Sequence, residues 1–211
     1  MDRKIRIQAV IDYFQDKMPE PETELAYVNP YELIVSVILS AQCTDKRVNM
    51  ITPALFRKFP GPEQLASASQ EEVFELIRSC SYPNNKAKHL RGMARVLTDE
   101  FNGKVPDNVE SLQKLPGVGR KSANVIASVI HRMPVMPVDT HVFRVSARIG
   151  LTKGAKNPLQ TENQLYKVFP AEMIPRAHHW LLLHGRYICQ ARKPKCEECG
   201  LKEFCNYYLS G

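Results

Sequence analysis

The sequence lacks the features of a membrane or secreted protein. None of its apolar runs approaches the roughly 20 residues that a membrane-spanning helix needs. Its charged start, MDRKIRIQAVIDYF, has neither the apolar core nor the cleavage site of a secretory signal peptide. We therefore expect an intracellular, cytoplasmic protein.

The chain also contains little that favours β-structure or disorder. Alternation of apolar and polar residues over strand length is absent, and the extended stretch VMPVD, at 135–139, is short and holds a proline. No repeat, low-complexity segment or Gly/Ser linker occurs, so any domain boundary must be compact. The 44% of hydrophobic residues is enough for a buried core. These patterns predict an all-α fold.

Helical periodicity covers almost the whole chain. Apolar residues recur at spacings of three and four, as they do over 86–101, and AHHWLLLHGRY at 177–187 is typical of a buried helix. Residues that commonly start or stop helices flank these runs. The expected starts and stops are Asp2; Asn29 with Pro30; a capping box of Ser69 and Glu72; Gly103 as a stop; a second capping box of Asp107 and Glu110; Asp139 or Thr140, with Gly150 as a stop; and Thr161 with Gln164.

Positive charge exceeds negative charge. The 29 Lys and Arg residues against 22 Asp and Glu residues give a net charge of +7. Such a balance favours a polyanionic partner such as nucleic acid, but it also fits many ordinary basic proteins. Charge alone does not decide the function.

The stretch LPGVGRKSA, at 115–123, predicts a helix, a glycine hairpin and a second helix. The first helix is expected over 105–115 and the second over 120–131. Glycine permits positive φ and the close approach of another chain, and the N-terminus of a helix attracts anions. The hairpin therefore predicts a binding site for a nucleic-acid phosphate, with an ordinary αα-hairpin as the alternative.

Lys121 lies in the first turn of the second helix, beside Arg120. The helix dipole and the neighbouring cation both disfavour an ammonium group there, which lowers its proton affinity. A lysine in this setting is a candidate nucleophile for an electrophilic carbon. The alternative is a phosphate contact or a solvated surface residue.

Asp139 and His141 form a second polar group, in VDTHVFR. An aspartate before a helix is most often a cap. If Asp139 faces Lys121, its carboxylate has a chemical role: it stabilises positive charge at a sugar C1′ as a base departs, and it accepts a proton from the attacking amine. His141 is either a core histidine or a hydrogen-bonding partner.

The cysteines predict a metal centre near the end of the chain. Cys189, Cys196, Cys199 and Cys205 follow the spacing C-x6-C-x2-C-x5-C, whereas Cys43 and Cys80 stand alone. In a reducing compartment such clustering indicates metal ligation. Four thiolates suit a tetrahedral zinc ion and a four-iron cluster equally well, so the metal stays open at this point.

Several separated motifs, in order, resemble the endonuclease III family of base excision repair. They are ILSAQCTDKRVN, LPGVGRKSANVI, PVDTHVFRVSARI and HHWLLLHGRYICQARKPKCEECGLKEFC, and the resemblance runs from about residue 25 to 205. It implies a six-helix barrel domain over 22–133, with a helix-hairpin-helix at 107–131. It also implies a cluster domain made of 1–21 and 134–211, with its cluster loop over 189–205, and DNA lying in the groove between the two domains.

The resemblance assigns roles to individual residues. Lys121 is the expected nucleophile, Asp139 the catalytic aspartate, and Cys189, Cys196, Cys199 and Cys205 the ligands of a [4Fe-4S] cluster. Gln42 matches an inserted glutamine, while Tyr82 replaces the leucine that usually accompanies it. Cys43 replaces an alanine, and we interpret it as a small packed residue. The implied DNA contacts are Gln42, Tyr82, Gly117, Gly119, Arg120, His141, Arg186, Arg192, Lys193 and Lys195.

The activity implied is that of a DNA glycosylase and AP lyase. It removes oxidised pyrimidines from double-stranded DNA through a lysine Schiff base, as a monomer in a bacterial cytoplasm near the nucleoid. One alternative is a monofunctional adenine glycosylase, which lacks a lysine at position 121 and carries a further C-terminal domain. Another is a zinc-dependent DNA-binding module without catalysis, which would be colourless where a four-iron protein is yellow-brown.

Overall fold

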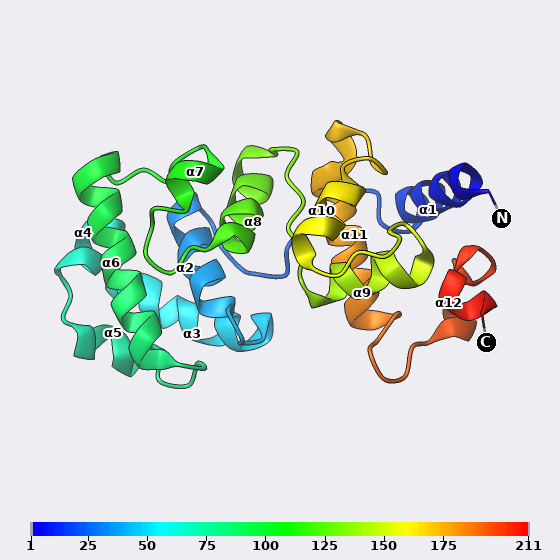
Figure 1. Ribbon diagram of the computed structural model, residues 1–211. Helices are drawn as coiled ribbons and strands as arrows, with labels where there is room; N and C mark the ends of the chain where they lie inside the picture. Colours follow the sequence, from blue (N-terminus) through cyan, green and yellow to red (C-terminus); the bar gives the residue numbers. More distant parts are fainter. Residues whose placement is uncertain (1, 211) are drawn as a thin grey trace. The chain divides into compact units, whose positions relative to one another are not determined.

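The computed structural model describes residues 2–210, and every regular element within that range is a helix (Figure 1). This confirms the predicted all-α class. No helix among these residues is long and apolar enough to cross a bilayer. The α-helices are α1 (Arg3–Lys17), α2 (Pro30–Ser40), α3 (Asp45–Lys58), α4 (Pro62–Ser67), α5 (Gln70–Ile77), α6 (Pro83–Phe101), α7 (Val109–Leu112), α8 (Arg120–His131), α9 (Thr140–Ile149), α10 (Pro158–Leu165), α11 (Ile174–Tyr187) and α12 (Asn206–Leu209). The 3-10 helices η1 (Ala171–Met173), η2 (Cys196–Glu198) and η3 (Lys202–Phe204) lie among them.

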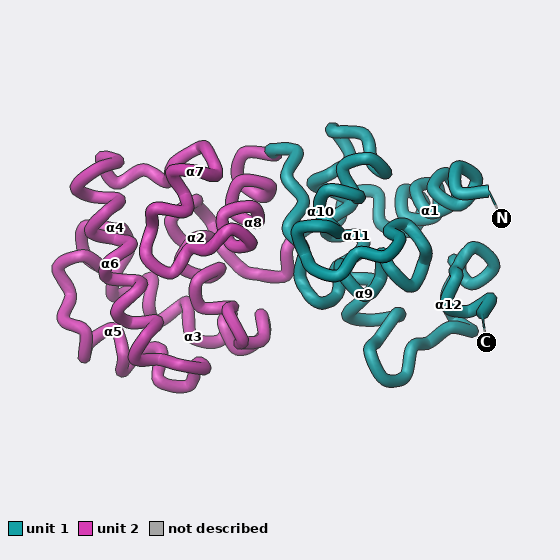
Figure 2. The backbone as a smooth tube through the Cα atoms, viewed as in Figure 1, with its two compact units in different colours: residues 1–22, 133–211 teal, residues 23–132 magenta. Residues whose placement is uncertain are grey.

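The chain divides into two compact units, which Figure 2 shows in different colours. One unit is formed by residues 23–132. The other combines residues 1–22 with residues 133–211, so it draws on both ends of the chain. Lys121 belongs to the first unit, and Asp139 belongs to the second together with the four clustered cysteines.

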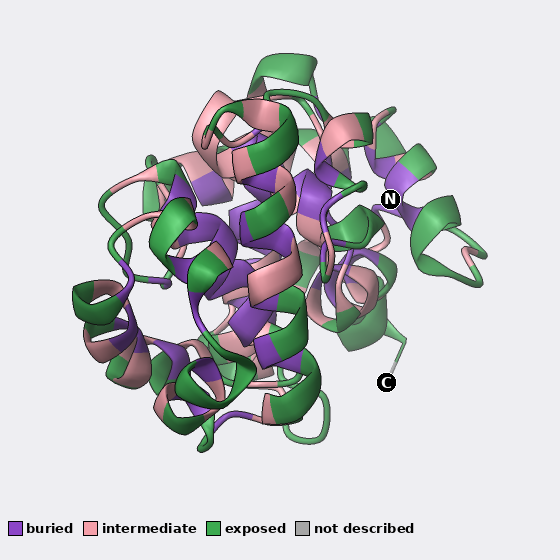
Figure 3. Ribbon diagram, turned by 90° about the vertical axis from the view of Figure 1, so that its left-hand side faces the viewer, coloured by how far each residue is buried: buried purple, intermediate pink, exposed green. Residues whose placement is uncertain are grey.

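Helix α2 forms the centre of the unit made by residues 23–132. Its residues Tyr31 and 33–39 are buried, and α3, α6 and α8 pack against it. Figure 3 shows buried and exposed stretches alternating along the helices. The Asn29 side chain accepts a hydrogen bond from the Glu32 backbone N at 2.9 Å, and Pro30 occupies the first turn, as predicted. Each fully buried aliphatic side chain stabilises the unit by roughly 1.5–3 kcal/mol.

The predicted capping box at the start of α5 is confirmed. Ser69 Oγ accepts a hydrogen bond from Glu72 N at 3.1 Å, and Glu72 Oε2 accepts one from Ser69 N at 2.9 Å. The Ser69 backbone donor, assisted by Lys58 3.0 Å away, lowers the pKa of the Glu72 carboxyl to about 2. The capping carboxylate is therefore charged at any pH near neutrality.

The N-terminal helix α1 is part of the core of the second unit. The Phe14 ring lies nearly parallel to the Trp180 ring of α11, with an interplanar angle of 9° and centroids 5.7 Å apart. Trp180 Nε1 donates a hydrogen bond to Met18 O at 2.6 Å. Because Phe14 and Trp180 are both fully buried, α1 helps to hold α11 and, through it, α9. Asp2 caps α1 as predicted, accepting from Lys4 N at 3.0 Å.

Helix α7 is shorter than predicted, and the second capping box is wrong. The cap is Asn108 and not Asp107: Asn108 Oδ1 accepts a hydrogen bond from Ser111 N at 2.8 Å. Pro106 disfavours a helical conformation at the residue before it, so the chain does not enter a helix at 105. The helix expected over 105–115 is therefore a single helical turn, Val109–Leu112, followed by non-helical turns.

One other predicted helix start is also wrong. Thr161 is buried inside α10, which Asn157 caps by accepting from Gln160 N at 2.9 Å ahead of Pro158. Helix α6 covers the periodic run of 86–101 and begins three residues earlier, at Pro83, because proline fits the first turn. It ends at Phe101, and Gly103 follows with a positive φ of 74°.

Candidate functional site

The hairpin before α8 uses its two glycines differently. Gly117 has a φ of +83°, and a Cβ atom there would lie 2.9 Å from the Cβ of His89. Gly119 is the N-cap of α8 in an extended conformation, and a Cβ there would meet nothing within 4 Å. Gly117 therefore shapes the turn, whereas Gly119 leaves the N-terminus of α8 uncovered. An anion can approach the first N–H groups of α8 there.

Lys121 is exposed on the first turn of α8, whose predicted range of 120–131 is confirmed. Within residues 2–210 its side chain takes part in no hydrogen bond or ion pair. The opposite face of the helix is anchored, because Ala123, Ile126 and Ala127 are fully buried. The amine of Lys121 is thus open to solvent while the helix that carries it is fixed by packing, which suits contact with a ligand.

Asp139 is the N-cap of α9, as predicted. Its Oδ1 atom accepts hydrogen bonds from His141 N and Val142 N, each at 2.8 Å. Both bonds go to the same oxygen, so the cap does not use Oδ2. Gly150, at a φ of +91°, ends the helix, also as predicted.

The extended segment before Asp139 is held from two sides. His178 Nδ1 donates to Pro137 O at 2.9 Å, since a carbonyl oxygen only accepts. The Tyr166 hydroxyl accepts a hydrogen bond from Met136 N at 3.1 Å. Met136 is fully buried. The carboxylate therefore projects from a rigid segment that α11 and the end of α10 position.

His141 is half-buried and contacts Arg144. The Arg144 Nη2 lies 3.1 Å from His141 Nδ1, which must accept because a guanidinium only donates. Arg144 also donates to Gly185 O at 2.9 Å and to Cys189 O at 3.1 Å. The neutral His141 ring therefore carries its proton on Nε2, and Arg144 joins α9 to the start of the cysteine loop.

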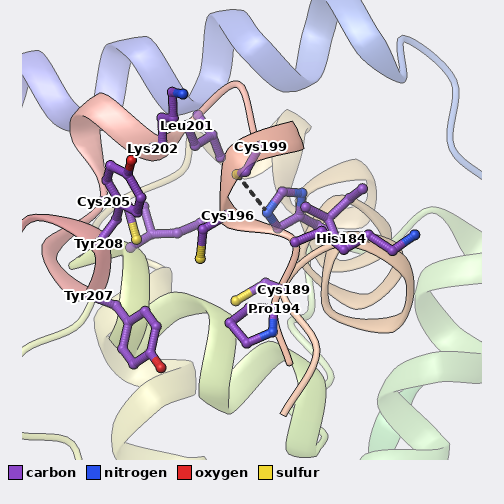
Figure 4. A pocket seen from close by; sticks show the side chains of 13 residues that line it. His184, Cys189, Pro194, Cys196, Cys199, Leu201, Lys202, Cys205, Tyr207 and Tyr208 are labelled. Atoms are coloured by element: carbon purple, nitrogen blue, oxygen red, sulfur yellow. Dashed lines mark hydrogen bonds between the residues drawn. The ribbon is translucent and has the colours of Figure 1, made fainter. Parts of the chain in front are cut away.

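The four clustered cysteines line one pocket (Figure 4). Ile149 and Leu201 form part of its apolar wall. Three of the sulfurs have polar neighbours: Cys199 Sγ lies 3.5 Å from His184 Nε2, Cys189 Sγ lies 3.6 Å from Arg148 Nη1, and Cys205 Sγ lies 3.3 Å from Arg148 O. Among residues 2–210, no three His, Cys, Asp or Glu side chains are grouped closely enough to ligate a single ion.

The chemistry of this pocket fits a sulfur-ligated cluster. Burial raises the pKa of Cys199, and its neighbours Cys205, Cys189 and Cys196 raise it further. Four thiolates together are therefore unfavourable without a cation, and a metal centre supplies the missing positive charge. His184 and Arg148 place donors beside the sulfurs, as second-layer partners of metal ligands usually do.

Arg148 also fixes the basic part of the cysteine loop. Its guanidinium donates to Gln190 O at 2.7 Å and to Ala191 O at 2.9 Å, and it stacks over the Tyr207 ring at 4.4 Å. Further along, Lys195 N donates to Ile188 O at 2.9 Å. These bonds close a loop whose basic side chains are exposed: Arg192, Lys193 and Lys195. Arg186, just ahead of the loop, is half-buried.

Gln42 and Tyr82 occupy two neighbouring turns of the other unit. Both have left-handed backbones, with φ of 55° and 53°, and the Tyr82 side chain is 63% exposed. Ser81 Oγ donates to Gln42 O at 2.5 Å, which joins the turns directly. Below them, the buried Lys86 donates from Nζ to Leu39 O at 2.7 Å, at the end of α2. Gln42 and Tyr82, the pair that the resemblance predicts to insert into DNA, are thus both exposed to solvent.

Sequence reasoning missed Arg144, Arg148, His184 and Lys86. Of these, His184 was the easiest to find from the sequence, because it lies in the predicted buried helix at 177–187, five residues before Cys189. The two arginines and Lys86 donate hydrogen bonds to backbone carbonyls that lie 41 to 47 residues away along the chain. The acceptors are Gly185 for Arg144, Gln190 for Arg148 and Leu39 for Lys86. Only the fold brings such partners together.

Two family models match the chain. Residues 35–171 match the HhH-GPD superfamily of base excision DNA repair proteins, and residues 189–205 match the iron-sulfur binding domain of endonuclease III. The helical fold, the glycine hairpin and the cysteine loop thus define a base excision DNA repair protein that holds an iron–sulfur cluster.

Individual relatives narrow the assignment. The chain is 45% identical to endonuclease III of Rickettsia conorii, over 97% of each sequence, and 40% identical to that of Escherichia coli K12, over 98% and 97%. Among solved structures it matches a trapped endonuclease III–DNA covalent intermediate, with a TM-score of 0.93, 40% identity and coverage of 100% and 99%. A non-covalent endonuclease III–DNA complex matches equally well, at 0.93, 39% identity and coverage of 100% and 98%. The chain belongs to the endonuclease III family, the DNA glycosylases with AP lyase activity, and its cofactor is a [4Fe-4S] cluster.

Proposed function

We propose that this protein removes oxidised pyrimidines from double-stranded DNA and then cleaves the strand on the 3′ side of the abasic site. The observation that carries the proposal is the exposed, unpartnered amine of Lys121, on a helix whose N-terminus is left uncovered by Gly119. A phosphate at that N-terminus brings the sugar within reach of the amine.

Lys121 acts as the nucleophile. Its Nζ atom attacks C1′ of the damaged nucleotide, the N-glycosidic bond breaks, and the base leaves with the bonding electrons. Opening of the sugar gives an imine between Nζ and C1′. Loss of a C2′ proton then forms a C2′–C3′ double bond and expels the 3′ phosphate, which is β-elimination.

Asp139 supports this step from the other unit. Its Oδ1 atom is committed to the cap of α9, so we assign the chemistry to Oδ2. The carboxylate stabilises the positive charge that develops at C1′ and accepts a proton from the amine nitrogen as it bonds to C1′. The proposal requires both side chains to act on the same nucleotide.

The remaining predicted residues bind DNA. Backbone N–H groups at Gly117 and Gly119, together with Arg120, contact phosphates at the hairpin. Arg186, Arg192, Lys193 and Lys195 contact phosphates near the cysteine loop, and His141 contacts DNA at the start of α9. Gln42 and Tyr82 fill the space that the extruded nucleotide leaves, with the Tyr82 ring stacking on the orphaned base.

The [4Fe-4S] cluster orders the loop that carries the basic side chains. Its ligands are Cys189, Cys196, Cys199 and Cys205.

We propose that residues 22–133 form the barrel domain and that residues 1–21 with 134–211 form the cluster domain. We further propose a monomer that works in the bacterial cytoplasm, on nucleoid DNA. Size-exclusion chromatography with light scattering tests the monomer, and a dimer would contradict it.

The substrate is tested with duplexes that each carry a single modified base. Oxidised pyrimidines should yield free base and a strand cut 3′ to the lesion. Undamaged duplex and duplex with a mispaired adenine should yield neither. Release of adenine without strand cleavage would instead identify a monofunctional adenine glycosylase.

A further inference from the structure

Two cysteines outside the cluster loop lie side by side. The Sγ atoms of Cys43 and Cys80 are 3.8 Å apart although 37 residues separate them in the chain. Both belong to the unit formed by residues 23–132, whereas the cluster loop belongs to the other unit. Cys43 is half-buried and Cys80 is 5% exposed, so the pair has one side that solvent reaches.

The backbone holds the pair together on both sides. Cys43 N donates to Ser40 O at 3.0 Å after α2, and Cys80 N donates to Ile77 O at 2.8 Å after α5. The residue before Cys43 and the residue after Cys80 are linked by the hydrogen bond from Ser81 Oγ to Gln42 O. The proximity of the sulfurs therefore follows from packing of two helix ends and does not depend on the thiols themselves.

The two thiols differ in exposure and surroundings. Burial, followed by the hydrogen bond with Cys43, raises the pKa of the Cys80 thiol to about 11, while the nearby Lys86 and Arg47 lower it. Cys43 is the more exposed sulfur, and exposure favours attack on an external reagent. Cys80 is placed to react with Cys43 alone.

We propose that Cys43 and Cys80 form an oxidisable dithiol site whose substrate class is a low-molecular-weight disulfide. The Cys43 thiolate attacks one sulfur of the reagent, which forms a mixed disulfide and releases one thiol. The Cys80 thiolate then attacks Cys43 Sγ, forms the Cys43–Cys80 bond and releases the second thiol. Two electrons pass to the reagent, and the two cysteine protons end on its two thiols.

The bond requires the sulfurs to approach from 3.8 Å to about 2.05 Å, and we assign this shift to rotation of the two cysteine side chains. It would join the turn of Gln42 covalently to the turn of Tyr82. Any effect on DNA binding rests on the proposed role of those two residues. Formation of the disulfide bond does not rest on that role, so it can be tested independently of catalysis.

The test uses the reduced, cluster-loaded protein with oxidised glutathione as the probe. After reaction the protein is denatured, alkylated and digested with trypsin. Cleavage after Lys17, Lys46, Arg78 and Lys86 places the two cysteines in separate peptides, 18–46 and 79–86. Visible absorbance, recorded before denaturation, confirms that the cluster stayed intact.

In the wild type, peptides 18–46 and 79–86 should be linked by a bond that a reductant breaks. The variant Cys80→Ser should stop at the mixed disulfide, with glutathione on Cys43. In Cys43→Ser, Cys80 should remain a free thiol. Wild-type protein in which both cysteines stay alkylated, or in which Cys43 retains glutathione as it does in Cys80→Ser, would overturn the proposal. The wild-type result decides even if a variant does not fold.

Discussion

The Nε2 atom of His184 lies 3.5 Å from the Sγ atom of Cys199. The ring of His184 packs edge-on against Phe14, with centroids 5.4 Å apart. Burial lowers the pKa of His184 to about 4, which favours a neutral ring. A ligating thiolate only accepts hydrogen bonds, and the one ring proton is therefore placed on Nε2 as a donor to the cluster's sulfur.

Replacing this donor should weaken the hold on the cluster. In His184→Phe an aromatic ring still packs against Phe14, but the hydrogen bond to Cys199 is lost. We expect retention of the cluster against a chelator to fall by about 10- to 100-fold. The measurement is the decay of visible absorbance, with His179→Phe, also on α11, as the matched control. Equal decay in both variants would mean that His184 only fills space.

The two hairpin glycines should respond differently to alanine. Gly117→Ala forces an L residue to a φ of +83° and places its Cβ 2.9 Å from His89, so the free energy of unfolding should fall by about 1–2 kcal/mol. Gly119→Ala meets nothing within 4 Å, so it should lower this free energy only by the poorer N-capping of alanine, about 0.5–1 kcal/mol. Denaturant unfolding measures both values.

The two glycine variants also distinguish an effect on the turn from an effect on phosphate contact. Gly119→Ala adds a methyl group where DNA approaches, so its affinity for duplex DNA should fall although its stability is largely kept. If Gly119→Ala binds DNA as tightly as the wild type, the N-terminus of α8 is not a phosphate site.

Lys193, one of the exposed lysines of the cysteine loop, should contribute charge to DNA binding without selectivity for damage. Lys193→Ala should weaken binding to damaged and undamaged duplex alike, and the slope of log affinity against log salt should become shallower by about 0.9. Lys156→Ala, an exposed lysine of the same unit outside the predicted contacts, is the control and should leave the slope unchanged. A Lys193→Ala slope equal to the wild-type slope rules out a phosphate contact.

The variant Asp139→Asn distinguishes the helix-capping role of Asp139 from its proposed catalytic role. Asparagine caps helices about as well as aspartate, so the variant should keep its stability and its affinity for abasic-site DNA. Turnover should drop by about 100-fold or more, because the charge that stabilises C1′ is gone. Single-turnover cleavage and equilibrium binding measure the two effects. Loss of both to the same extent indicates that Asp139 serves only α9.

The helix that carries the nucleophile was predictable from local sequence, and the one before it was not. Apolar periodicity and Gly119 define α8 without help from the rest of the chain. At α7, however, Asp107 and Asn108 are both good caps, and sequence alone does not rank them. The choice of Asn108 depends on how Pro106 constrains the approach to the helix.

The cysteine spacing indicated a metal centre, but its supporting side chains depend on tertiary structure. Arg148 and His184 matter because the fold brings them to Cys189 and Cys199, at 3.6 and 3.5 Å. Likewise, nothing local to Cys43 predicts that Cys80 is its neighbour. Residue type and spacing therefore identify the cysteine ligands. The side chains that hydrogen-bond to those cysteines become known only from the packing of the fold.

The most direct test of the central claim is borohydride trapping on abasic-site duplex DNA. The reagent reduces the imine between an amine and C1′, so it records which side chain is the nucleophile. We predict a covalent protein–DNA complex for the wild type and for Lys114→Ala, an exposed lysine just before the hairpin. Lys121→Ala should bind the same duplex yet form no complex. A complex of undiminished yield with Lys121→Ala would contradict the assignment of Lys121 as the nucleophile.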